Sequence, residues 1–328
     1  MPMKPWLQPV WDGLCARIDA QRFPHALLLT GPSGLGKREL VAALVARLLC
    51  STPRADGHAC GLCRGCVLRA AGSHPDRVTV TLEPRDDGKL RTEITIDQIR
   101  ALGARFASRP SFGGWQVVSV DPADRMNVAA ANALLKTLEE PSANTALILV
   151  ADEPSRLPAT IRSRCQRIEL RPPDLVSASA WLTAQGIGQA VADEALLFAD
   201  GNPGAAKALL DADAGRMIDA LISDMGDAAR GKPLVAIAAR WGEQDGDILF
   251  ALLARLVLLA MRVSPQTQTL PRIAAMARLT AQADFRKLQA WWDRLNLARA
   301  RLPTPLRKDL AIIELLDEWR AAMNADAA

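Results

Sequence analysis

A glycine-rich segment near the amino end has the residue types that bind phosphate. The string Gly31-Pro-Ser-Gly34-Leu-Gly36-Lys37-Arg38 matches the G-x-x-x-x-G-K-(S/T) loop except at its last position. In such a loop, backbone N–H groups turn inward on a phosphate, and the start of the following helix adds partial positive charge. Lys37 would reach the terminal phosphates of a nucleotide. Gly31, Gly34, Gly36 and Lys37 are therefore candidate nucleotide-binding residues.

Two residues depart from what phosphoryl transfer requires. Arg38 stands where a hydroxyl normally binds Mg²⁺, and a guanidinium has only hydrogen-bond donors and cannot coordinate a metal. Asp121 ends an apolar run and suits the second half of an ATPase site, but Pro122 follows where a glutamate would orient the attacking water. Asp124 would replace this glutamate only with a geometry that is foreign to such sites. We expect no efficient hydrolysis. Whether the segment keeps a nucleotide pocket or is only a strand–turn–helix scaffold stays open.

Four cysteines offer a second kind of chemistry. Cys60-x-x-Cys63-x-x-Cys66 is a tight run, and Cys50 lies ten residues before it. Four thiolates at this spacing suit a closed tetrahedral zinc site with a structural role. An iron–sulfur cluster uses a similar run, but its fourth ligand follows as Cys-Pro, which this segment does not contain. The spacing favours zinc over that cluster and over a cysteine cluster without metal.

The elements around these residues alternate between strand and helix. Apolar runs predict strands at 25–30, 116–120, 145–151 and 166–170, and alternation predicts a further strand at 78–82. Helical patterns cover 37–49 and 129–138, so the glycine-rich loop follows a strand and opens a helix. Residues 50–73 show no periodicity. The pattern predicts an α/β domain with a parallel sheet.

The chain changes character after a linker. Arg171-Pro-Pro-Asp174 is typical of a linker, and the pattern beyond it is helical, with breaks at 201–204 and 231–233. We expect three domains: 1–170, with the cysteine module at 50–73, then a small helical domain at 171–210 and a larger one at 211–328.

Composition limits the class of protein. The chain has 328 residues, 49% of them hydrophobic and 23% charged, which is ordinary for a globular protein and excludes dominant disorder. Its most apolar run, Ile248–Met261, contains Arg255 and is too short to span a bilayer, so we expect it to be a buried helix. The first residues lack the pattern of a signal peptide. These features predict a cytoplasmic protein with reduced cysteines.

Charge and tryptophan gather in the last third of the chain. The net charge is only +4, but residues 250–308 contain eleven basic and two acidic residues. This stretch would face DNA or an acidic partner, or it is a solvated helix surface. Trp291 and Trp292 would form a stacking platform for bases, or belong to the core or a protein contact.

Further motifs point to a family. After the glycine-rich loop and the four cysteines come the strings Ala131-Asn-Ala-Leu-Leu-Lys-Thr-Leu-Glu-Glu-Pro141 and Ile161-Arg-Ser-Arg-Cys165, in that order. Together they closely resemble bacterial clamp-loader subunits of the AAA+ class. The resemblance implies an AAA+ P-loop domain with a zinc insertion, a helical lid and an all-α collar. It also implies a hetero-pentameric ring that uses ATP to open a sliding clamp and place it on primed DNA.

The resemblance assigns a role to one arginine. In such rings the nucleotide lies between neighbouring subunits, and the arginine of the Ser-Arg-Cys motif reaches the neighbour's γ-phosphate. Arg164 would therefore be an arginine finger acting in trans, a role that suits a planar and permanent cation. The alternative is a surface arginine paired with a carboxylate.

Two more nucleotide-handling positions depart from the active members of the family. Asp152 is anionic where a polar residue senses the γ-phosphate, and Gly204 replaces the arginine of the lid motif. With Arg38 and Pro122 included, the resemblance implies a subunit of the DNA polymerase III clamp loader that lends a finger and does not hydrolyse ATP itself, while its binding of ATP or ADP stays open. The alternatives are an active ATPase motor subunit of the same machine and a zinc-containing DNA-binding module.

Overall fold

The computed structural model describes residues 3–85, 87–106, 109–262, 270–281, 283–302 and 308–323, and it divides into two compact units. The first unit comprises residues 1–174 with 202–205, and the second comprises 175–201 with 206–328.

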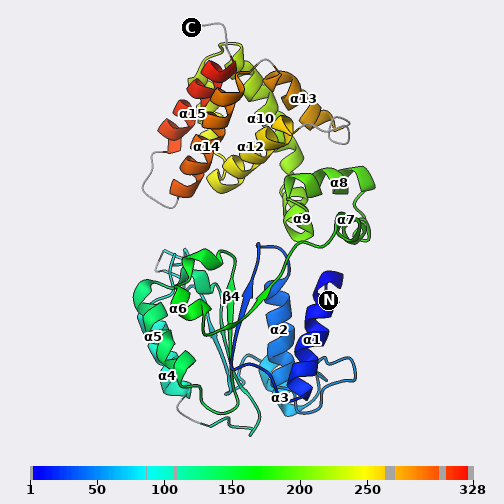
Figure 1. Cartoon of the computed structure of the whole chain (residues 1–328), viewed down its shortest axis with the longest axis vertical. Coiled ribbons are helices and arrows are strands. Elements are labelled where there is room, and N and C mark those ends of the chain that lie inside the picture. The colour runs from blue at the N-terminus through cyan, green and yellow to red at the C-terminus, as the bar shows by residue number, and fades with distance from the viewer. Residues whose placement is uncertain are drawn as a thin grey trace. The chain divides into compact units, whose positions relative to one another are not determined.

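The first unit is built on a parallel sheet of five strands (Figure 1). The strands are β1 (Ala26–Thr30), β2 (Arg77–Val80), β3 (Gln116–Val120), β4 (Thr145–Ala151) and β5 (Gln166–Glu169). Their order is β2-β3-β4-β1-β5, so β1 lies inside the sheet between β4 and β5. This confirms the predicted α/β domain with a parallel sheet.

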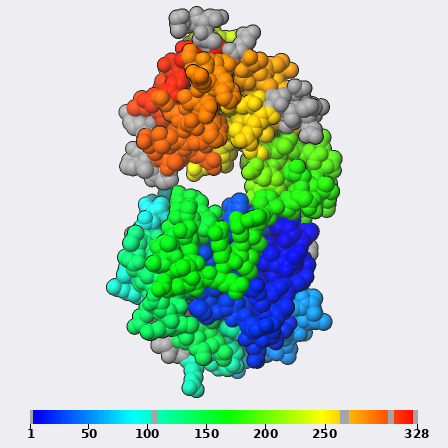
Figure 2. Space-filling model, in the orientation of Figure 1, coloured from blue at the N-terminus to red at the C-terminus, as the bar shows by residue number. Residues whose placement is uncertain are grey.

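Helices cover both faces of this sheet. They are α1 (Gln8–Asp19), α2 (Lys37–Leu48), α3 (Arg64–Ala70), α4 (Ile96–Phe106), α5 (Val128–Glu139) and α6 (Ala159–Arg162), with short 3₁₀ turns η1 (Pro5–Leu7), η2 (Ala123–Arg125) and η3 (Pro154–Arg156). Figure 1 shows α1 to α3 on one side of the sheet and α4 to α6 on the other. The space-filling view shows the same division, with amino-terminal residues in blue on one side and green residues on the other (Figure 2).

The first four residues of β1 are apolar because both faces of this strand are covered. Successive side chains of a strand point to opposite faces. Leu27 and Leu29 accordingly pack with α1 and α2 in one apolar cluster, while Ala26 and Leu28 pack with α5 in another. A parallel strand covered on both faces is a nearly continuous apolar run. The result is a rigid strand that ends at the glycine-rich loop.

The second unit is entirely helical in its described residues. Its helices are α7 (Leu175–Thr183), α8 (Gln189–Phe198), α9 (Pro203–Asp211, whose first turn belongs to the first unit), α10 (Ala214–Ala229), α11 (Leu234–Gly242), α12 (Gly246–Met261), α13 (Pro271–Thr280), α14 (Phe285–Arg301) and α15 (Lys308–Met323). One apolar cluster joins α7 to α9, and a larger one joins α10 to α15 around α12. The expected division into domains 171–210 and 211–328 stays a prediction. No helix in the described part of the chain is long and apolar enough to cross a membrane.

The tryptophan pair belongs to the core of this unit. Trp291 is 2% exposed, and its indole N–H donates to the carbonyl of Leu315 at 2.7 Å. The indole N–H of Trp292 donates to the carbonyl of Ala254 on α12 at 2.9 Å. Trp291 therefore belongs to the core and its ring is not available to bases, whereas Trp292 is partly buried against the same cluster.

Part of the basic stretch is neutralised within the unit. Arg272 pairs with Glu194 at 2.6 Å and with Asp219 at 2.8 Å. Arg255 pairs with Asp200 at 2.9 Å. Arg294 pairs with Glu318, and Lys308 donates to the carbonyl of Gly242. Arg307, which also belongs to this stretch, lies outside the described residues. The cations that are paired in this way have less charge to offer a partner.

Candidate nucleotide and metal sites

The glycine-rich loop has the backbone that its sequence predicts. Gly31, Gly34 and Gly36 all have positive φ angles, of 130°, 92° and 91°. A side chain is strained in this region, whereas glycine adopts it freely. A Cβ atom on Gly31 would also lie 2.1 Å from the carbonyl oxygen of Leu170. The loop therefore needs its glycines to connect β1 to α2.

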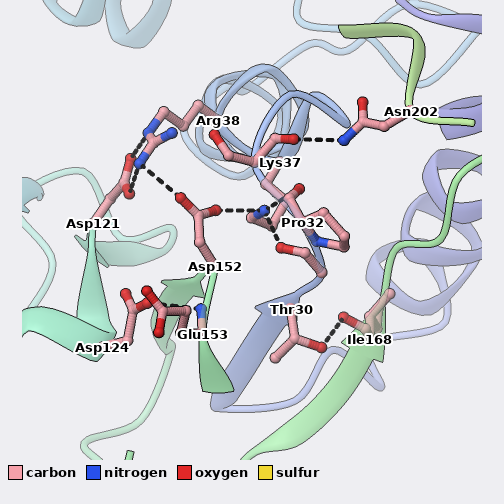
Figure 3. Close-up of polar contacts among 12 residues, drawn as sticks. Thr30, Pro32, Lys37, Arg38, Asp121, Asp124, Asp152, Glu153, Ile168 and Asn202 are labelled. Carbon is pink, nitrogen blue, oxygen red and sulfur yellow. Dashed lines mark hydrogen bonds and ion pairs between the residues drawn. The ribbon is translucent and has the colours of Figure 1, made fainter. Parts of the chain in front are cut away.

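Lys37 is held inside this loop. Its side chain is only 2% exposed, and Nζ donates to the carbonyls of Gly31 at 2.5 Å and Pro32 at 2.8 Å. Nζ also forms an ion pair of 2.5 Å with Oδ1 of Asp152, which follows β4 (Figure 3). The lysine that would meet a terminal phosphate is thus neutralised by the aspartate that stands in the sensor position.

Arg38 makes a parallel contact with the aspartate that follows β3. Its Nε donates to Oδ2 of Asp121 at 2.7 Å, and Nη2 donates to Oδ1 at 3.0 Å (Figure 3). Burial lowers the pKa of Arg38, but the hydrogen bond to Asp121 outweighs it and raises the pKa above its usual value. A bidentate arginine–carboxylate pair is specific in geometry. It occupies both oxygens of the carboxylate that would otherwise help to hold Mg²⁺.

Asp124 has a structural contact. The residue is 7% exposed, and Oδ2 accepts the backbone N–H of Glu153 at 2.8 Å. Asp124 also lines a cavity of about 370 Å³ together with Arg38, Pro122 and Asp152. The contact of Asp124 with Glu153 joins η2 to the segment after β4.

The break at 201–204 lies directly on the glycine-rich loop. The side-chain amide of Asn202 donates to the carbonyl of Ser33 at 2.7 Å, and its Oδ1 accepts the N–H groups of Gly204 and Ala205 at 3.1 Å each. A Cβ atom on Gly204 would lie 1.9 Å from the carbonyl oxygen of Gly34. An arginine at position 204, as the lid motif has it, does not fit this arrangement. The role of Asn202 is not predictable from the sequence, because its partner Ser33 is remote in the chain.

The structure brings the four predicted cysteines together. The Sγ atoms of Cys50, Cys60, Cys63 and Cys66 all lie within 4.8 Å of one another. Two of the distances between sulfurs, Cys60 to Cys66 and Cys50 to Cys63, are 3.9 Å. A tetrahedral zinc with bonds of about 2.3 Å requires sulfurs about 3.8 Å apart. The geometry therefore fits the zinc ion that the spacing predicts.

Hydrogen bonds from neighbouring residues favour the thiolate form of Cys60 and Cys63. The Thr52 hydroxyl and the N–H groups of Cys63 and Leu62 lower the pKa of Cys60 to about 7. Burial raises the pKa of Cys63, but hydrogen bonds led by the Cys66 N–H outweigh it and lower the pKa to about 5. Burial raises the pKa of Cys66 to about 12. A bound cation would be needed to deprotonate this last thiol.

Local structure holds the cluster against the sheet domain. Cys63 caps α3, since its sulfur accepts the N–H of Cys66 at 3.5 Å. The sequence analysis assigned no helix to this segment, and α3 corrects that. The ring of His58 stacks on Trp11 of α1 with centroids 4.6 Å apart, so the module is anchored to the first helix.

Arg164 lies on the surface just after α6. Its Nη2 forms an ion pair of 2.6 Å with Glu139 at the end of α5, and Nη1 donates to the carbonyl of Thr160 at 3.1 Å. The side chain is 37% exposed. Arg164 is thus a surface arginine paired with a carboxylate, as the alternative interpretation expects, and this carboxylate belongs to the helix of the Leu-Glu-Glu-Pro motif.

Comparison with known proteins gives consistent results. The family model described as "DNA polymerase III, delta subunit" matches residues 7–174. The DNA polymerase III subunit delta' of Pseudomonas aeruginosa is 46% identical over 54% of this chain and 52% of its own length. That of Escherichia coli is 42% identical over 64% of this chain and 61% of its own length. That of Yersinia pestis is 30% identical over 98% of this chain and 96% of its own length.

These matches confirm the resemblance drawn from the motifs. The chain spans only about half to three fifths of the first two relatives, at 52% and 61%, but nearly the whole of the third. The chain therefore belongs to the family of bacterial clamp-loader subunits known as DNA polymerase III subunit delta'.

Proposed function

We propose that this chain is a non-hydrolysing subunit of the DNA polymerase III clamp loader that supplies Arg164 to a nucleotide bound by a neighbouring subunit. The observation that carries the proposal is the pair of ion pairs at the glycine-rich loop. Lys37 is bound to Asp152, and Arg38 is bound to Asp121. The side chains that should handle phosphate and Mg²⁺ therefore neutralise each other.

Hydrolysis of ATP needs a free lysine and a free carboxylate at this loop, and the two ion pairs occupy both. A γ-phosphate would have to displace Asp152 from Lys37, and Mg²⁺ would have to displace the guanidinium of Arg38 from Asp121. Pro122 provides no carboxylate for the attacking water. Catalysis of phosphoryl transfer rests on positioning and electrostatics. ATP or ADP would enter this pocket only as a ligand that is not cleaved, with Gly31, Gly34, Gly36, Lys37 and Asp121 as its contacts.

Arg164 retains what the trans role needs. The side chain is partly exposed, and its ion pair with Glu139 is at the surface, where such pairs contribute little to stability. A neighbour's γ-phosphate would therefore compete effectively for the guanidinium. A single planar cation of this kind accelerates phosphoryl transfer strongly when it reaches the transferring group.

The remaining parts have structural roles in this proposal. Cys50, Cys60, Cys63 and Cys66 hold a zinc ion that stabilises the insertion, and all four ligand positions are protein sulfurs, which is typical of a structural site. The helices at 171–210 form the lid, and those at 211–328 form the collar of a hetero-pentameric ring. The assembled ring, rather than this chain alone, binds the sliding clamp and primed DNA in the cytoplasm.

Phosphate release by the purified chain separates this proposal from an active motor subunit. We expect no Mg²⁺-stimulated hydrolysis of ATP above the background of a mock purification. Addition of primed DNA should not change this result, because the missing groups belong to the chain itself. Robust turnover with Mg²⁺ would favour the motor alternative. Tight, salt-sensitive DNA binding by the lone chain would favour the DNA-binding module.

A further inference from the structure

A second cavity of the first unit lies between α2 and the edge of the sheet at β2. It has a volume of about 160 Å³. Its polar lining comes from four elements and consists of Arg38, Arg69, Arg77, Thr79, Ser119 and Asp121. It shares only Arg38 with the cavity beside Asp124, and it also borders Asp121, a candidate contact of the nucleotide.

The charge of this cavity is strongly positive. Three guanidinium groups face one carboxylate, for a net charge of +2. That carboxylate, Asp121, already receives two hydrogen bonds from Arg38. Within the described part of the chain, neither Arg69 nor Arg77 forms an ion pair with a carboxylate. Arg69 and Arg77 thus line the cavity without an ion pair of their own among the described residues.

Arg69 also has a buried hydrogen-bond donor that lacks an acceptor among the described residues. This donor is its Nε atom. A buried donor without an acceptor is costly, and the cost is greater when the group is charged. Arg69 lies on α3, one turn after the ligand-candidate Cys66, so its backbone is fixed by the thiolate module. Arg69 as a residue therefore lines the cavity from a fixed position on α3, while its Nε lies beneath the surface.

The rest of the cavity lining indicates which kind of ligand would accept hydrogen bonds from the arginines. The hydroxyls of Ser119 and Thr79 lie 3.3 Å apart and provide small polar groups on the sheet. On α2 the lining is apolar, with Val41, Ala42 and Val45, which strengthens electrostatic attraction inside the cavity. The volume is below the roughly 300–1,000 Å³ of pockets for drug-sized ligands. A small, multiply charged oxyanion matches this size and charge, and arginine binds such oxygens in a bidentate way.

We propose that this cavity binds free inorganic phosphate or pyrophosphate between Arg69, Arg77 and Arg38. The site bridges α3, β2 and α2, so an anion there would tie the thiolate module to the sheet. The proposal shares Arg38 and Asp121 with the function proposed above, but it can be tested separately because neither ATP hydrolysis nor Arg164 takes part in it.

Calorimetric titration of the full chain tests this site, with inorganic phosphate and pyrophosphate as separate probes at constant ionic strength. We expect saturable binding of at least one of the two at a single site. Arg69→Gln and Arg77→Gln should each weaken it by about tenfold or more, the effect of one lost charge-assisted hydrogen bond. The matched control is Arg100→Gln on α4, which removes an equal charge from an exposed side chain and should leave the affinity unchanged.

Three results would overturn the proposal. The wild-type chain would bind neither probe, or both arginine variants would bind as tightly as wild type, which would place the anion at the Lys37 loop. Alternatively, Arg100→Gln would weaken binding as much as the cavity variants, which would show attraction by overall charge. The melting temperature of each variant is measured first. If Arg69→Gln does not fold, Arg69→Lys replaces it, and we expect weaker binding because lysine lacks the planar fork.

Discussion

The residues around the glycine-rich loop show how a nucleotide site loses its chemistry and keeps its backbone. Three glycines preserve the loop, while Asp152 and Asp121 each hold one of the two cations that follow it. The sequence predicts that Arg38 cannot hold Mg²⁺, because this follows from its chemistry alone. It does not predict that Arg38 binds Asp121, since 83 residues separate them and only the pairing of β3 and β4 and the position of α2 bring them together.

Asp152 is the residue that most directly limits nucleotide binding in this arrangement. Asp152→Asn removes the charge that holds Lys37 and that would repel a γ-phosphate. We expect the affinity for ADP or ATP to rise by about tenfold or more, in line with the strength of hydrogen bonds to charged groups. Binding of a fluorescent ADP analogue measures the change. Asp97→Asn on α4 serves as a control for general charge, because it neutralises an exposed carboxylate. An Asp152→Asn variant with unchanged affinity would show that another contact closes the pocket.

A substitution at Gly204 tests whether residues 202–204 pack closely on the glycine-rich loop. Gly204→Ala places a methyl group against the carbonyl of Gly34, so the segment has to move. We expect a loss of about 1–3 kcal/mol in the free energy of unfolding. Gly13→Ala in α1 meets nothing within 4 Å and should instead stabilise by about 0.5–1 kcal/mol, because alanine favours a helix. Urea denaturation measures both, and equal stability of the two variants would contradict the contact.

At the scale of elements, the strands were easier to predict than the helices. The strands at 116–120 and 145–151 agree with β3 and β4 at every residue, because buried parallel strands are short apolar runs. The helix α1 was missed, although Trp11, Leu14 and Cys15 lie on one buried face, since Gly13 interrupts the pattern. The helix α3 was missed for another reason. It begins at a cysteine cap and is held by the cluster, so it carries no apolar period.

The thiolate module should depend on its metal. Cys63→Ser removes one of four sulfur ligands and the cap of α3, so we expect zinc content to fall from one ion per chain to nearly none. The melting temperature should fall as well, because metal binding contributes to folding of such modules. Cys165→Ala is the control, since Cys165 is buried in an apolar cluster away from the four. Atomic absorption on dialysed protein measures the metal, and undiminished zinc in Cys63→Ser would contradict the site.

At the scale of the whole molecule, each unit has its own core. The parallel sheet carries the loop, the thiolate module and Arg164, whereas the second unit is helical around α12 and buries Trp291. The sequence predicted the apolar Ile248–Met261 helix, because its pattern is local. It could not decide between core and surface for the tryptophans or the basic stretch, because burial and ion pairs depend on which helices pack together.

The central claim is that this chain lends Arg164 to a neighbour's nucleotide and hydrolyses none itself. The most direct test is ATP turnover by a reconstituted clamp loader that contains Arg164→Ala, compared with one that contains Arg162→Ala on α6. We predict that both rings assemble and that Arg164→Ala abolishes hydrolysis at the one adjoining site, a loss of about a thousandfold there. The total turnover then falls by the share of that site, while Arg162→Ala turns over as wild type. Unchanged turnover of the Arg164→Ala ring would contradict the account.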